Sequence, residues 1–135
     1  MTPLLAAWLI AATPSQCQPL WPKVFAALEK EGEPFEKSQL ARKVPGAKDK
    51  LRLAWLERCA GFSPEVLACA TGADLAAELA EARRVLEEGR TPKDEVEKIL
   101  ARLRADWKIF DCKEVSSAVD AAARQVAIDA GLEKP

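Results

Sequence analysis

Apolar residues recur along much of this chain at intervals of three and four, which is the spacing of one face of an α-helix. The strongest such stripe begins after Thr91-Pro92 and occupies five positions: Val96, Ile99, Leu100, Leu103 and Trp107. The segment before it, from Thr71 or Asp74 to Glu88, is stopped by Gly89 and repeats apolar residues at heptad-like spacing: Leu75, Leu79, Ala82 and Leu86. The sequence lacks alternating β-branched runs, so the pattern predicts an all-α protein.

Proline and glycine residues divide the preceding part of the chain into shorter helices. They predict helices from Pro22 to Gly32, from Pro34 to Arg42, from about Ala47 to Cys59, and from Ser63 to about Gly72. The start of the fourth is typical, because Ser63 can cap it, Pro64 fits its first position and Glu65 lies in its first turn.

The last expected helix carries an apolar face and ends at Gly131. Asp111 and Glu114 have the spacing of a capping box at its start. Its apolar positions are Cys112, Val115, Val119, Ala122 and Val126. We therefore expect an irregular bundle of about six short helices joined by short turns.

The N-terminus has the features of a secretory signal peptide. Leu4–Ala12 is an apolar run of nine residues, followed by small and polar residues. This run is shorter than the roughly 20 residues that span a bilayer. We expect a signal peptide over 1–15, cleaved after Ala12 or near Ser15, and one helical domain over 16–135. The alternative is a short helix packed on the core, since no Lys or Arg precedes the run.

Four cysteines, Cys17, Cys59, Cys69 and Cys112, are the candidates for disulfide bonds. An even number in a small exported chain favours two bridges that staple the helices. The alternative is four reduced thiols that pack as small apolar side chains, because Cys59 and Cys112 lie on apolar helix faces.

The pairing of these cysteines has a local and a long-range solution. Cys59 and Cys69 flank a helix corner and are out of register in a simple antiparallel hairpin, so a bridge between them requires a steep crossing. The long-range solution joins these two to Cys17 and Cys112, in either combination. We favour the long-range pairing, because bridges that close long loops stabilise an alanine-rich core by about 3–5 kcal/mol each.

Composition and charge narrow the classes of partner. Apolar residues make up 49% of the 135 residues but aromatic residues only 6%, which predicts a core mostly of Ala, Leu and Val. The net charge of −1 provides no long-range field for nucleic acid. The basic cluster of Arg42, Lys43, Lys48, Lys50 and Arg52 is interpreted as solvated surface. The polar face of 92–107 is mixed in charge, so we expect its apolar stripe to pack in the core, and membrane association is not expected after signal removal.

The chain contains no histidine. Ser-His and Cys-His nucleophiles and His-ligated zinc are therefore excluded. The carboxylates alternate with Lys and Arg at helical spacing, as on a solvated face. There is no phosphate-binding glycine loop and no CxxC, so we expect no enzyme activity, catalytic residue, cofactor or metal site.

Two resemblances concern the segment between Cys59 and Cys69. The spacing Cys59-x9-Cys69 resembles half of the twin CX9C pattern of helical-hairpin proteins, but GFSP interrupts the helix and no second such pair follows. The segment CAGFSPEVLAC is similar to one in small, uncharacterised, cysteine-containing exported helical proteins of myxobacteria. This second resemblance implies an exported helical protein and no particular activity.

These observations predict an exported, non-catalytic helical module, periplasmic or secreted, with a structural or protein-binding role. The protein partner is not identified by the sequence. The alternative is a cytoplasmic helical adaptor or regulator with reduced cysteines.

Overall fold

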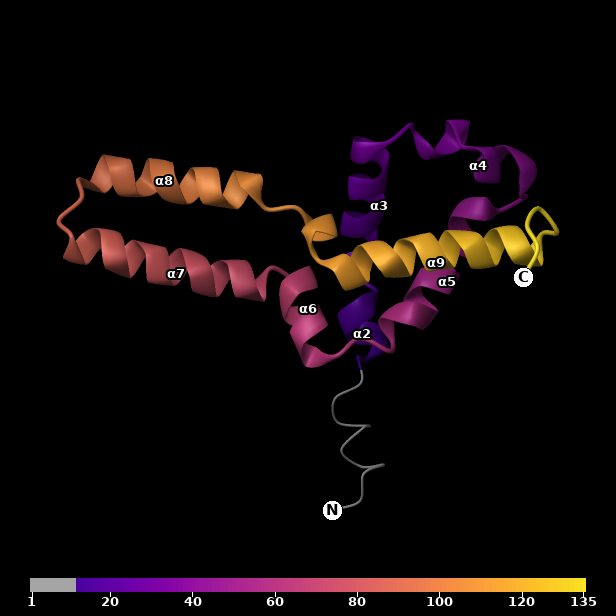
Figure 1. Ribbon diagram of the computed structural model, residues 1–135, viewed down its shortest axis with the longest axis horizontal. Coiled ribbons are helices and arrows are strands. Elements are labelled where there is room, and N and C mark those ends of the chain that lie inside the picture. Colours follow the sequence, from indigo (N-terminus) through magenta and orange to yellow (C-terminus); the bar gives the residue numbers. More distant parts are fainter. Residues whose placement is uncertain (1–11) are drawn as a thin grey trace, which may run out of the picture.

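The computed structural model describes residues 12–135, which form helices and no strand (Figure 1). The α-helices are α2 (Pro14–Cys17), α3 (Leu20–Glu31), α4 (Gln39–Lys43), α5 (Ala47–Cys59), α6 (Pro64–Ala70), α7 (Ala73–Glu88), α8 (Lys93–Asp106) and α9 (Lys113–Asp129). Two 3-10 turns accompany them, η1 (Phe35–Lys37) and η2 (Ile109–Asp111). The predicted all-α fold is confirmed. The predicted signal peptide lies mostly outside the described residues.

The described chain divides into two parts, which we name the body and the arm. The arm consists of residues 73–106, where α7 and α8 pack side by side as an antiparallel hairpin that projects from the rest (Figure 1). The body consists of 12–72 and 107–135. Its central contact is between α5 and α9. Helix α2 packs on α5, α6 packs on α9, and α3 contacts α2 and η2.

The body contains one continuous apolar core in which aromatic rings are prominent. Trp55 is fully buried and its ring lies 5.9 Å from that of Trp21 and 6.1 Å from that of Phe62, centroid to centroid. Phe25 connects Trp21 to Phe35 at 5.7 and 5.5 Å. The expectation of a core mostly of Ala, Leu and Val is confirmed for the described residues, because these three types supply 13 of the 21 buried core residues. Four of the eight aromatic side chains are also buried in this core.

Local capping signals place several helix ends where the sequence predicts them. Helix α5 begins at Ala47 and ends at Cys59 as expected. Ser63 caps α6, since its Oγ accepts a hydrogen bond from the Val66 amide at 3.3 Å. The single helix predicted from Pro34 to Arg42 is wrong: Ser38 is extended and separates η1 from α4, and its Oγ accepts from the Ala41 amide at 3.2 Å.

Two predicted helix starts differ in the structure. Helix α7 is preceded by Gly72 in the left-handed conformation (φ 83°), rather than capped by Thr71 or Asp74. The capping box of Asp111 and Glu114 does not form. Asp111 instead closes η2, where its carboxylate accepts a hydrogen bond from the Lys108 amide at 3.2 Å. Asp111 therefore belongs to the 3-10 turn that precedes α9, and Cys112 is the residue at the N-cap of α9.

Candidate interaction surface

The four cysteines form two long-range disulfides. Cys17 is bonded to Cys59 and Cys69 to Cys112, with Cα atoms 6.0 Å apart in both pairs. The long-range pairing favoured by the sequence is confirmed, and the combination it left open is settled. Among the described residues no cysteine is free.

The two bridges have different places in the fold. Cys17–Cys59 ties α2 to the end of α5 inside the core, where these residues are 2% and 0% exposed. Cys69–Cys112 joins the last turn of α6 to the residue that precedes α9. It therefore connects the chain just before the arm to the chain just after it, and the whole arm is a loop closed at its root.

The arm has a thin interior. Val96 and Leu100 on α8 are buried, but they are not part of the body core, and no residue of α7 is buried. The heptad-like stripe of α7 is only half covered, because a single neighbouring helix packs on it. Its members are Leu75, Leu79, Ala82 and Leu86.

One side of the arm is polar and ion-paired. Arg83 on α7 donates a hydrogen bond to Glu97 on α8 at 2.9 Å, and its guanidinium also lies 3.7 Å from Glu87. This contact lowers the pKa of Glu97, and the hydrogen bond to Glu97 raises the pKa of Arg83. A shallow hollow on this side is lined by Arg83, Glu87, Thr91, Lys93 and Val96. We name this side the ion-paired face.

The other side of the arm carries three exposed apolar side chains among charged ones. Val85 and Ile99 are each two residues beyond a member of the Arg83–Glu97 pair, so each lies about 160° from that pair around its helix. Both therefore point to the opposite side, as does Leu103 one turn beyond Ile99. Their exposed fractions are 53%, 39% and 42%. We name the side that carries Val85, Ile99 and Leu103 the apolar face.

This apolar face departs from the sequence-based expectation. Ile99 and Leu103 belong to the stripe that was expected to pack in the core, yet only Val96 and Leu100 of that stripe are buried. Val85 was not singled out by the periodicity. Of the five large apolar side chains that are exposed among the described residues, three lie on the arm. Such clustering is typical of an interaction surface.

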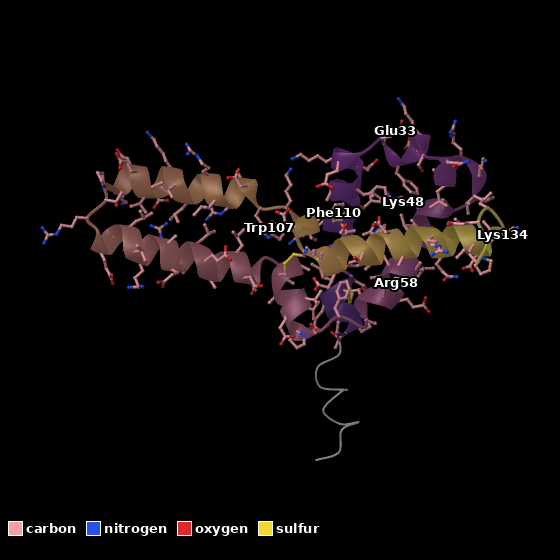
Figure 2. The ribbon with its side chains drawn as sticks, viewed as in Figure 1. Glu33, Lys48, Arg58, Trp107, Phe110 and Lys134 are labelled. Atoms are coloured by element: carbon pink, nitrogen blue, oxygen red, sulfur yellow. A yellow bond between two sulfur atoms is a disulfide. The ribbon has the colours of Figure 1, made fainter. Side chains whose placement is uncertain are left out.

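Other hollows lie on the body, and their linings combine exposed polar side chains with core residues such as Ile109 and Phe35. One of about 460 Å³ lies between α3 and the root of the arm, with Lys30, Glu31 and Trp107 in its lining. Figure 2 shows Trp107 at this junction, where the chain passes from α8 into η2. Within residues 12–135 no polar or charged residue is buried, and no three metal-ligating side chains cluster.

Four of the five residues of the basic cluster that was predicted as solvated surface are exposed, and the fifth, Arg52, is half-buried. Lys48 lies over the ring of Phe25 at 4.3 Å, and Arg52 lies 3.9 Å from Asp49. Two cations of the cluster, Lys48 and Arg52, therefore make contacts within the body. In the part of the chain that the structure describes, no helix has the length and apolar character needed to cross a membrane.

Fold and site together define an all-α, disulfide-stapled domain with a projecting helical arm. Comparison with protein-family models, with curated proteins and with solved structures gives no match for this chain.

Proposed function

We propose that this protein is an exported, non-catalytic helical module, periplasmic or secreted, that binds a protein partner through the apolar face of its arm. The observation that carries the proposal is the exposure of Val85, Ile99 and Leu103 together on one side of a two-helix hairpin. Burying such side chains is favourable by roughly 25 cal/mol per Å² of apolar surface, and a partner surface supplies that burial.

The disulfides support the exported part of the proposal. Two bridges that use all four cysteines are typical of oxidising compartments. Protein recovered from its native host and analysed without reductant should be about 4 Da lighter than its reduced form, because each bridge lacks two hydrogen atoms. Four titratable thiols in that material would contradict export.

Site-specific photo-crosslinking tests the binding part in the native host. A photoreactive residue at Leu103, on the apolar face, should give an adduct of defined mass with one protein. The matched control is Arg84, which lies on the same arm with its guanidinium held by Glu81 and Glu88. Equal labelling at Leu103 and Arg84, or labelling at neither position, would contradict the proposed surface.

A further inference from the structure

We propose that the Cys69–Cys112 bridge, which we name the root bridge, is a site of thiol–disulfide exchange. Its co-reactant is the thiolate of a dithiol, which is thereby oxidised. The Cys17–Cys59 bridge, which we name the body bridge, does not exchange while the body is folded. This inference goes beyond the proposed function, because it does not depend on which partner covers the apolar face.

The two bridges differ in how far solvent reaches them. Cys69 is half-buried and precedes by two residues the exposed Thr71, in the turn between α6 and α7. Its partner Cys112 and both cysteines of the body bridge are buried. Figure 2 shows the sulfur–sulfur bond of the root bridge where α6 meets the start of α9. Because exchange requires a thiolate to reach one of the two sulfurs, the fold directs attack to Cys69.

The four cysteines also differ in the helix ends beside them. Cys112 is the N-cap residue of α9, a helix of 17 residues. Cys17 and Cys59 are the last residues of α2 and α5, and Cys69 lies in the last turn of α6. A helix N-terminus stabilises a neighbouring thiolate, whereas a C-terminus disfavours it. Since a stabilised thiolate is the better leaving group, Cys112 is the sulfur that departs when Cys69 is attacked.

The exchange has two steps. In the first, the attacking thiolate forms a bond to the sulfur of Cys69, and the Cys69–Cys112 bond breaks. Its electron pair stays on the sulfur of Cys112, which takes a proton from water. In the second step the other thiol of the dithiol loses its proton and attacks the reductant's sulfur in the mixed disulfide, which releases Cys69 to be protonated. The bridge gains two electrons and two protons, and the dithiol becomes a disulfide.

Reduction of the root bridge changes what holds α6 to the body. In the oxidised protein the end of α6 is bonded to the residue that precedes α9. After reduction α6 is held by non-covalent packing, with Leu67 and Ala70 in the body core. Helix α7 follows α6 after two residues, so α6 can then open together with the weakly packed arm. The redox state of the root bridge thus sets how far the opening of the arm spreads into the body.

Glutathione added to the oxidised full chain under native conditions tests the site of attack. The reaction is quenched with N-ethylmaleimide, and peptide mapping without reductant locates each modification. We expect glutathione on Cys69, maleimide on Cys112 and an intact body bridge. In denaturant, where both bridges are accessible, this selectivity should disappear. Glutathione on Cys112, exchange at the body bridge first, or no exchange in the native protein would overturn the proposal.

Dithiothreitol measures the difference between the two bridges. It should reduce the root bridge at least about a hundredfold faster than the body bridge, because the body bridge becomes accessible only when the body opens. Reduced thioredoxin in its place distinguishes the source of the dithiol: reduction of the root bridge by thioredoxin assigns a protein reductant, and reduction by dithiothreitol alone assigns a small one. Equal rates for the two bridges would overturn the exchange site.

Hydrogen exchange on the singly reduced protein tests the effect on the arm. Protection should fall about tenfold in α6 and in the arm, while the middle of α5 keeps its protection. The variant Cys69→Ser/Cys112→Ser should reproduce this pattern without any reductant. Unchanged protection of α6 in both samples would overturn the effect of the root bridge on the arm.

Discussion

The body and the arm are built from the same kind of helix but are held together differently. In the body, α5 and α9 bury a shared core that includes the fully buried Trp55. In the arm, only Val96 and Leu100 are buried, and four of the six ion pairs of the described chain lie there. Burial of apolar area contributes far more to stability than exposed ion pairs. The comparison indicates that the body is the more stable part and the arm the less stable one.

The disulfides match this division. One bridge lies inside the body core and constrains how its N-terminal segment packs. The other closes the root of the arm, so the covalent path through the body is complete whether or not the arm is folded. We infer that the root bridge lets the arm open locally without unfolding the body.

The largest effect is expected from removing the bridge of the body. The variant Cys17→Ala/Cys59→Ala opens a loop with a sequence separation of 42 residues. The chain-entropy treatment gives a loss of about 4 kcal/mol for a loop of this size. For a domain of this size we expect a fall in melting temperature of more than about 10 °C, measured by circular dichroism on oxidised protein.

The reduced protein provides the control for that bridge. Cys59→Ala alone should lower the melting temperature sharply in oxidised protein but only modestly in reduced protein, where Cys59 acts by packing. Equal losses under both conditions would show that Cys59 stabilises the body through burial and not through its bond.

The next largest effect is local to the arm. Leu100→Ala removes one of the two buried side chains between α7 and α8, and such truncations cost about 2–5 kcal/mol. We expect hydrogen-exchange protection to fall throughout the arm, while the melting temperature of the body changes little. Leu51→Ala, at a buried position of α5, is the matched control and should lower the melting temperature directly.

The root bridge can be tested by combining these changes. In the background Cys69→Ala/Cys112→Ala, Leu100→Ala should lower the melting temperature of the body, because an opened arm then adds a long flexible loop to it. A Leu100→Ala variant that lowers the body melting temperature equally with and without the bridge would show that body and arm unfold as one unit.

The sequence predicts the helices of both parts better than it predicts their division. Local chemistry is readable: the Ser63 cap, the bounds of α5 and the long-range pairing of the cysteines all agree with the structure. The capping box predicted at Asp111 does not form, because once η2 forms the Asp111 carboxylate accepts a hydrogen bond from the Lys108 amide. Capping patterns do not distinguish a helix start from a turn just before it.

The apolar face could not be predicted from periodicity alone. A stripe shows which side of a helix is apolar, but the number of helices that cover it is a property of the fold. Half of the residues in α7 and α8 are charged, against fewer than a third in α9. This difference in charge content could have indicated that α7 and α8 are less buried than α9.

A smaller effect is expected at the tip of the arm. Arg90 adopts a left-handed conformation (φ 58°), although Gly89 beside it does not. This conformation is costly for a residue with a Cβ atom, and glycine adopts it without strain. Arg90→Gly should therefore raise hydrogen-exchange protection in the arm by up to about 1 kcal/mol and leave the body unchanged. Reduced protection at the ends of α7 and α8 would contradict this account.

The smallest effect is the response of the arm to acid. Arg83 lowers the pKa of Glu97, and Arg84 lowers that of Glu81, each through a hydrogen bond. A lowered carboxyl pKa means that the pairing stabilises the fold above the unfolded pKa of about 4.3 and is lost as pH falls through the lower folded pKa. Both carboxylates are exposed, so the effect is small.

We expect arm protection factors to decrease between about pH 5 and pH 3. Those of the body core should stay constant over this range, since no charged residue of the described body is buried. Glu97→Gln should reduce this dependence in the arm, since only the Glu81–Arg84 pair then contributes, whereas Glu57→Gln on α5 should leave it unchanged. A dependence that persists unchanged in Glu97→Gln would show that the bridge between α7 and α8 contributes nothing to the arm.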